Sequence, residues 1–149
     1  MGINGVTPFN VQIFEKKGLG DIILGTKPLW ARYQSSNGQV KEIAIKPQQL
    51  PYFTAFNGRS TAEKPNLTSK DIFDIKVNIT KQTKGSKNVP VQNLSKTGTD
   101  FVLSKDSVER QDFFGLLDLY SDASSDSGKE ITPKEQADII DTYTQWYKE

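Results

Sequence analysis

Hydrophobic and polar side chains alternate along several stretches of the first hundred residues. Phe9, Val11 and Ile13 are separated by polar residues, and residues 73–80 alternate apolar and polar side chains more regularly than any other part of the chain. Strict alternation is the pattern of a half-buried β-strand, because successive side chains of a strand point to opposite faces. The pattern therefore predicts a strand in each stretch.

Two further apolar segments flank a turn sequence. Residues 29–34 and 40–46 are separated by Ser-Ser-Asn-Gly-Gln at 35–39. Asn-Gly favours positive φ at both central turn positions, so the two segments predict a β-hairpin. Shorter strands are predicted at 22–24, as a buried strand between two glycines, and at 101–103.

Two stretches interrupt the strand pattern. Residues 47–70 contain three prolines and an apolar cluster of Tyr52, Phe53 and Phe56, and so long a connection is usually functional or flexible. Residues 81–99 carry lysines among Gly, Ser and Thr. This composition predicts a basic, exposed loop or a loose hairpin, and in the hairpin residues 89–91 would form an edge strand.

The hydrophobic period changes from two to helical spacing near Asp106. Asp106 followed by Glu109 is a capping-box pattern, which predicts the start of a helix. Thr132, Pro133 and Glu135 combine an N-cap, a proline at the first helical position and a capping glutamate, which predicts a second helix. The connection between the helices is short, so we expect them to be antiparallel neighbours or a helix-loop-helix unit.

These elements predict an α+β protein with an N-terminal antiparallel β-barrel or sandwich and a C-terminal helical hairpin. Charge divides at the same boundary. Residues 1–106 hold 15 Lys and Arg against 8 Asp and Glu, whereas residues 107–149 hold 4 against 10. We therefore expect a basic β-rich domain over 1–106 and an acidic two-helix segment over 107–149.

The chain contains no cysteine and no histidine. Thiol nucleophiles, disulfides, thiolate metal sites and the Ser-His-Asp triad are thereby excluded. Two carboxylate pairs, Asp71 with Asp74 and Asp138 with Asp141, are the remaining candidates for acid–base chemistry. We interpret both pairs as charges that favour solubility, and we expect no enzyme and no cofactor.

The apolar runs of the chain are only a few residues long, far below the ~18–20 residues that a membrane-spanning helix needs. The N-terminal sequence lacks the basic and apolar regions of a secretory signal. We expect a protein of the cytoplasm, or of a particle assembled there, that does not act at a membrane.

The segment between the two predicted helices is rich in oxygen-bearing side chains and ends in Ile131-Thr-Pro-Lys-Glu135. With an apolar helix on either side, it resembles the EF-hand family, in which the glutamate binds calcium through both oxygens. The loop spans 14 positions here instead of about 12, so the alternative is that Glu135 only caps the second helix. The resemblance implies as calcium ligands Asp122, Ser124, Asp126, Glu130 and Glu135.

Basic and aromatic residues are interleaved in the predicted β-region. Small β-barrels bind single-stranded nucleic acid with a cationic groove and stacking aromatic rings. The alternative is that the aromatic rings form the core and the lysines protect sheet edges. On the nucleic-acid hypothesis the binding residues are Trp30, Arg32, Tyr33, Lys46, Phe53, Arg59, Lys81, Lys84 and Lys87.

The hypothesis that we favour is a non-enzymatic structural or interaction module, a subunit of a larger assembly. Opposite charges on two segments favour head-to-tail self-association or docking onto a protein partner. Tyr143, Trp146 and Tyr147 are candidate anchors, because Trp and Tyr are enriched at binding hot spots; the alternative is that they pack on the chain's own sheet. A composition rich in Lys, Asn, Ser and Thr suits a component of a phage or viral particle.

Overall fold

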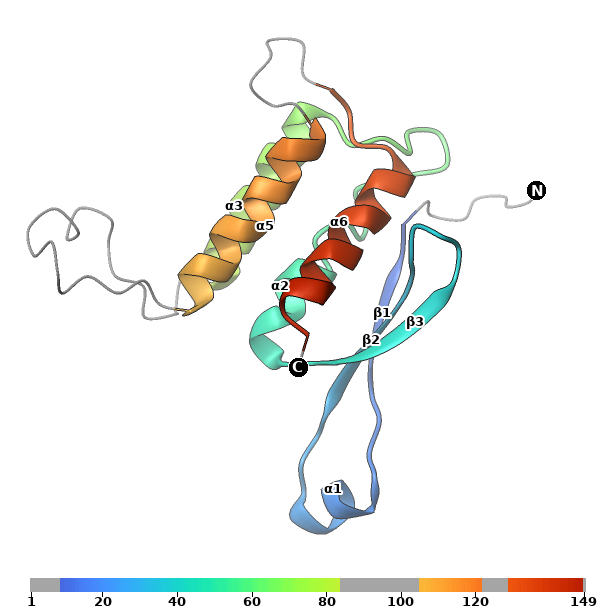
Figure 1. Cartoon of the computed structure of the whole chain (residues 1–149), viewed down its shortest axis with the longest axis vertical. Coiled ribbons are helices and arrows are strands. Elements are labelled where there is room, and N and C mark those ends of the chain that lie inside the picture. The colour runs from blue at the N-terminus through green and yellow to red at the C-terminus, as the bar shows by residue number, and fades with distance from the viewer. Residues whose placement is uncertain (1–8, 84–104, 122–128, 149) are drawn as a thin grey trace, which may run out of the picture.

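The computed structural model describes residues 9–83, 105–121 and 129–148. Figure 1 shows an α+β protein in which helices pack beside one small sheet, and the predicted C-terminal helices are confirmed. In chain order the elements are β1 (Val11–Glu15), α1 (Leu19–Leu24), β2 (Leu29–Gln34), β3 (Val40–Ile45), the 3₁₀ turn η1 (Pro47–Gln49), α2 (Leu50–Phe53), α3 (Ser69–Thr83), α5 (Lys105–Ser121) and α6 (Pro133–Trp146).

The sheet is an antiparallel meander of three strands in the order β1-β2-β3. Val11 of β1 lies opposite Tyr33 of β2, which in turn lies opposite Lys41 of β3. The predicted strand near residues 9–13 and the predicted hairpin at 29–46 are therefore confirmed. The described residues form one open sheet with two edges, and the predicted closed barrel or sandwich is not found among them.

A side chain caps one edge of the sheet. The backbone N–H of Val11 donates to Oδ1 of Asn57 at 3.0 Å, and Nδ2 of Asn57 donates back to the Val11 carbonyl at 2.9 Å. The amide of Asn57 thus takes the place of a neighbouring strand at this residue. Capping of this kind is one way in which proteins protect an exposed strand.

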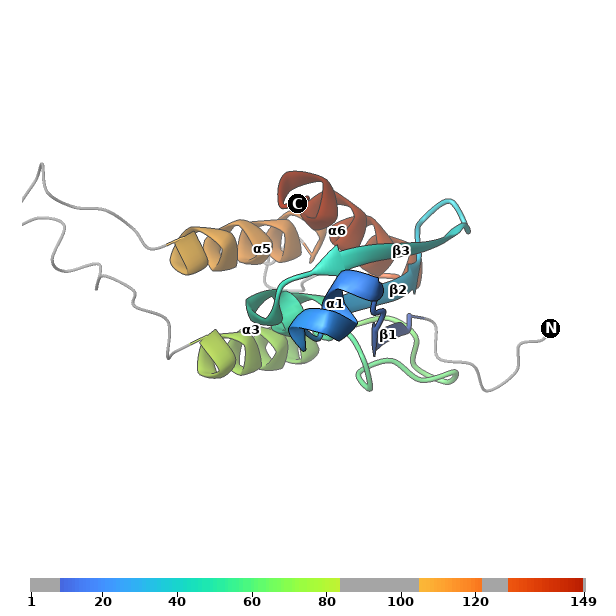
Figure 2. The same ribbon diagram turned by 90° about the horizontal axis from the view of Figure 1, so that it is seen from below.

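The inner face of the sheet packs against the helices. Figure 2 shows α6 lying along the sheet, with α3 and α5 side by side next to it. The rings of Tyr52, Phe53, Phe113 and Tyr143 meet with centroids 5.0–5.6 Å apart. Part of the predicted long connection at 47–70 is therefore core-forming, because α2 carries two of these rings, Tyr52 and Phe53.

The predicted strand at 73–80 is wrong, because these residues belong to helix α3. Its first turn is closed by a capping box: Asp71 Oδ2 accepts from the Thr68 N–H at 2.9 Å, and Thr68 Oγ1 accepts from the Asp71 N–H at 3.3 Å. Phe73, which a strand would bury with its alternate neighbours, is 64% exposed. The buried positions recur at helical spacing instead: Ile72, Ile75, Ile79 and Thr83.

The predicted buried strand at 22–24 is also wrong. These residues form the second half of helix α1, and none of its residues is buried. The predicted strand at 101–103 and all but three residues of the predicted basic loop at 81–99 lie outside the described residues. In the part of the chain that the structure describes, no helix is both long and apolar enough to cross a membrane.

Candidate interaction surface

The chain between β1 and β2 forms an arm that projects from the rest of the molecule. Residues 16–28, called the arm below, extend beyond the sheet and carry α1 at their end, at the bottom of Figure 1. The Lys16 N–H donates to the Pro28 carbonyl at 3.3 Å, so the β1–β2 pairing continues into the arm. Helix α1 is therefore held away from the core by two paired chain segments.

Helix α1 is defined by local signals in the sequence. Gly18 is its N-cap, with extended backbone, and Gly25 ends it at φ +73°, a left-handed conformation that favours glycine. Asp21 Oδ2 accepts from the Gly18 N–H at 2.9 Å, and Oδ1 accepts from Thr26 Oγ1 at 2.6 Å. The hydrogen bonds from Thr26 and Gly18 hold the pKa of Asp21 below its usual 3.8. One carboxylate thus joins both ends of this short helix.

The surface of α1 is aliphatic and exposed. Its four large side chains, called the α1 knob, are between 65% and 77% exposed. Soluble proteins seldom leave several large aliphatic residues together in water unless they bind another surface. The sequence pattern does not reveal this set, because a short apolar run between two glycines predicts a buried strand. The members of the knob are Leu19, Ile22, Ile23 and Leu24.

Lysines stand at the base of the knob. Lys17 and Lys27 flank α1 in the chain and are exposed. Lys16 Nζ lies 3.3 Å from a carboxylate oxygen of Glu42 and 4.4 Å from the ring centroid of Trp30. The knob is therefore an apolar tip, and positively charged side chains lie where it joins the rest of the arm.

The outer face of the sheet is covered by contacts between cations and aromatic rings. Arg32 lies over the Phe14 ring at 5.0 Å and pairs with Glu42 at 2.6 Å. The hydrogen bond from Arg32 is the largest of the effects that lower the pKa of Glu42. With Lys16 over Trp30, each half-buried aromatic ring on this face already has a cation against it.

The structure does not gather the residues of the nucleic-acid hypothesis into one surface. Trp30 and Arg32 share the outer face of β2. Tyr33 and Phe53 are both at least 98% buried on the other side of the sheet, with their rings 6.3 Å apart. Those two rings pack in the core, where no base can stack on them.

The remaining cations of that hypothesis are dispersed. Arg59 lies 3.8 Å from Asp74, and Lys81 is in the last turn of α3. Lys46 follows β3, and its backbone N–H donates to Gln49 Oε1 at 2.8 Å. The other two members, Lys84 and Lys87, lie outside the described residues.

The three aromatic residues proposed as partner anchors differ in exposure. Tyr143 is fully buried, and its hydroxyl donates to the carboxylate of Glu109. Burial and this hydrogen bond both raise the pKa of Tyr143. Tyr147 is partly buried and donates to Asp112, whereas Trp146 is 55% exposed. Of the three, only Trp146 presents most of its side chain to a partner.

The residues implied by the EF-hand resemblance have other roles where the structure describes them. Glu135 Oε1 accepts from the Thr132 N–H at 2.9 Å in the capping box of α6, and its Oε2 pairs with Lys129 at 2.9 Å. Glu130 accepts from Asn66 at 3.2 Å. Asp122, Ser124 and Asp126 lie outside the described residues. Among the residues described, no three acidic side chains gather closely enough to hold a metal ion.

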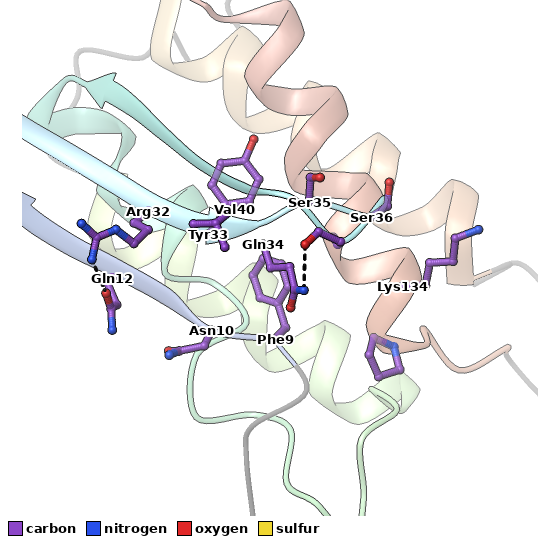
Figure 3. Close-up of a pocket in the computed structure, with 13 residues that line it drawn as sticks. Phe9, Asn10, Gln12, Arg32, Tyr33, Gln34, Ser35, Ser36, Val40 and Lys134 are labelled. Carbon is purple, nitrogen blue, oxygen red and sulfur yellow. Dashed lines mark hydrogen bonds between the residues drawn. The ribbon is translucent and has the colours of Figure 1, made fainter. Parts of the chain in front are cut away.

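A cavity of about 440 Å³ lies between the turn of the β2–β3 hairpin and the start of α6 (Figure 3). Phe9 and Tyr33 line it from the core side, and burial raises the pKa of Tyr33 to about 12. Gln34 donates to the Gly38 carbonyl at 3.0 Å across its rim. No carboxylate of the described residues lines this cavity.

No protein-family model, curated protein or solved structure matches the chain. The function must therefore be inferred from the molecule's own surfaces. Among those described above, the α1 knob is the surface on which four large aliphatic side chains are mostly exposed.

Proposed function

We propose that this protein is a non-enzymatic interaction subunit of a larger assembly, and that it docks onto a neighbouring protein through the α1 knob. The observation that carries the proposal is the exposure of four aliphatic side chains on a helix held away from the core. Burial of a Leu or Ile side chain contributes about 1.5–3 kcal/mol relative to its exposure. Docking would recover this free energy. From the composition, we expect the assembly to be a phage or viral particle.

The chemistry of the knob favours a protein partner over a nucleic acid. Bases bind through stacking on aromatic rings, hydrogen bonds and phosphate contacts. Aliphatic side chains provide none of these interactions, and Lys16 and Arg32 already lie over the rings of Trp30 and Phe14 on the outer face. An apolar recess on another protein is the surface that matches the knob.

Part of the charge asymmetry is used within the chain. Lys41 of β3 lies 3.8 Å from Asp141 of α6, and Lys76 of α3 lies 2.5 Å from Asp118 of α5. These pairs join the basic and acidic segments of one molecule. Head-to-tail attraction between copies is weakened to that extent, so we assign the docking contact to the knob.

Two measurements on the full chain test the proposal. The first is sedimentation velocity over a concentration series, which detects a second copy as the partner. The second is capture of proteins from the producing cells on the immobilised chain. Each is made with the wild type, with the double substitution Ile22→Ser and Ile23→Ser, and with Phe73→Ser as a control that removes an equally exposed side chain from α3.

We expect the wild type to self-associate or to capture a partner at a defined ratio. The double substitution should weaken that association at least tenfold, whereas Phe73→Ser should leave it unchanged. Thermal unfolding should be the same for all three proteins, because none of the replaced side chains is buried. Association that is equally strong in the double variant would refute the role of the knob.

A further inference from the structure

The edge of the sheet opposite Asn57 is formed by β3. Backbone groups of a strand point alternately to its two sides. The groups of Val11 bond to Asn57 and therefore point away from β2, so those of its opposite residue Tyr33 point to Lys41 on β3. The hydrogen bond from the Ser35 N–H to the Gln39 carbonyl, at 2.8 Å, follows the same alternation.

This alternation leaves three residues of β3 with backbone groups that point away from the sheet, namely Val40, Glu42 and Ala44. Their side chains lie on the exposed side of the strand. In the described part of the chain, no hydrogen bond satisfies these backbone groups. At Lys46, the next outward residue, the N–H is satisfied by Gln49. The free edge thus ends where η1 begins.

A cavity of about 220 Å³ runs beside this free edge. It lies between β3 and the C-terminal end of α6. Its apolar wall includes Ile43, Phe53 and Tyr143, and its polar rim includes Gln49, Thr144 and Lys148. A free strand edge next to a partly apolar groove is the arrangement that proteins use to bind a peptide as an added strand.

We propose that this groove binds an extended segment of a partner protein, which pairs with β3 as a fourth strand. The free backbone groups of β3 would bond to the segment, and its alternate side chains would enter the cavity. Aliphatic or aromatic side chains match the apolar wall. This site is separate from the α1 knob, so it does not depend on the function proposed above.

Charge defines the segment further. Glu42 at the groove is already neutralised by Arg32, at 2.6 Å, and by Lys16, at 3.3 Å. Lys148 makes no ion pair with any residue that the structure describes. Among the described residues, the charge left for a ligand is therefore positive, and the segment that matches it carries a carboxylate at the end that lies near Lys148.

The experiment uses the full, isotopically labelled chain and synthetic peptides as probes. The binding probe is a blocked octapeptide that alternates Thr with Val or Leu and ends in Asp. The control probe has proline at the Thr positions, which removes the N–H groups that strand pairing needs. Backbone amide shifts in NMR spectra report the site and the dissociation constant.

Two variants locate the contact. Ala44→Pro removes an N–H that points outward and leaves the pairing with β2 intact, which is where a strand tolerates proline. Lys148→Glu reverses one exposed charge and is the second test should the proline variant fail to fold. The Ile22→Ser and Ile23→Ser protein serves as the control for the knob.

We expect saturable shifts at Val40, Glu42 and Ala44 with the first peptide and none with the proline peptide. Ala44→Pro should weaken binding at least tenfold. Lys148→Glu should weaken binding of the Asp peptide and strengthen binding of a matching peptide that ends in Lys. The knob variant should bind the Asp peptide as the wild type does. The proposal would be overturned if the Asp peptide did not bind or if it shifted amides away from β3. It would also be overturned if Ala44→Pro and Lys148→Glu both bound the peptide as tightly as the wild type. Concentration-dependent shifts at β3 without peptide would also overturn it, in favour of a second copy.

Discussion

At the scale of single residues, the carboxylate of Asp21 stabilises helix α1, which carries the α1 knob, by hydrogen bonds at both of its ends. Its hydrogen bonds from Thr26 and Gly18 lower its pKa in the folded protein below 3.8. The stabilisation that it gives is therefore present above pH 3.8 and lost as the pH falls through the lower folded pKa. We predict that the amides of α1 lose protection from hydrogen exchange only at a pH below 3.8, the usual pKa of an aspartate.

The matched variant is Asp21→Asn, which keeps the shape of the side chain and removes its charge. It should remove the protection of the α1 amides from hydrogen exchange at neutral pH, so that this protection no longer changes with pH. The melting temperature of the core should stay the same. An unchanged exchange pattern in Asp21→Asn would show that the glycines alone define the helix.

The pair of Tyr143 and Glu109 is the second residue-scale feature with a measurable consequence. Both residues are buried, and the hydroxyl of Tyr143 is the donor to the carboxylate. Tyr143→Phe removes that donor and leaves a buried acceptor, which typically costs about 1–3 kcal/mol. Urea unfolding should show this loss, and Tyr147→Phe should lose less because Tyr147 is less buried. Equal losses would mean that burial does not distinguish the two hydroxyls.

At the scale of elements, α3 allows a direct test of helix against strand. A strand would bury Phe73 and Ile75 on the same face, whereas the helix exposes Phe73 and leaves Ile75 only 1% exposed. We therefore predict that Ile75→Ala lowers the free energy of unfolding by about 2–5 kcal/mol and that Phe73→Ala changes it little. Denaturant unfolding of the two variants measures the difference, and similar large losses in both would contradict the helix.

The elements that the sequence predicts well are those whose signals are local. The Asn-Gly turn specifies the hairpin, and Thr132 with Glu135 specifies the start of α6. The stretch at 22–24 is a short apolar run, which suits a strand or a helix alike, whereas the alternation at 73–80 favours a strand although these residues form a helix. Tertiary packing decides between them, although the capping signals at Thr68 and Gly18 already favour helices.

The knob was beyond sequence prediction for a different reason. The hydrophobicity of Ile22 and Leu24 indicates that burial of these side chains is favourable. It does not indicate whether they are buried in the protein's own core or against a partner. The same limit applies to Tyr33 and Phe53, whose aromatic rings suit a binding face and a core equally. Only the placement of the arm and the sheet in space separates these cases.

At the scale of the whole molecule, the basic and acidic segments share one core. Phe113, Leu117 and Tyr143 from the acidic segment pack with Tyr52 and Phe53 from the basic one. We therefore predict that a fragment of residues 1–106 does not fold alone. Circular dichroism and a narrow NMR amide dispersion should show this, with the full chain as the control. A cooperative thermal transition in the fragment would instead establish an independent domain.

The side chain of Asn57 has a consequence for how copies of this protein can be arranged. Open sheets are prone to join edge to edge, and a β3 edge laid on a β1 edge would repeat without limit and produce a fibre. Such a join would have to displace Asn57 from Val11 and break both of its hydrogen bonds. The asymmetry of the two edges therefore lets the sheet accept a strand at β3 while it opposes polymerisation.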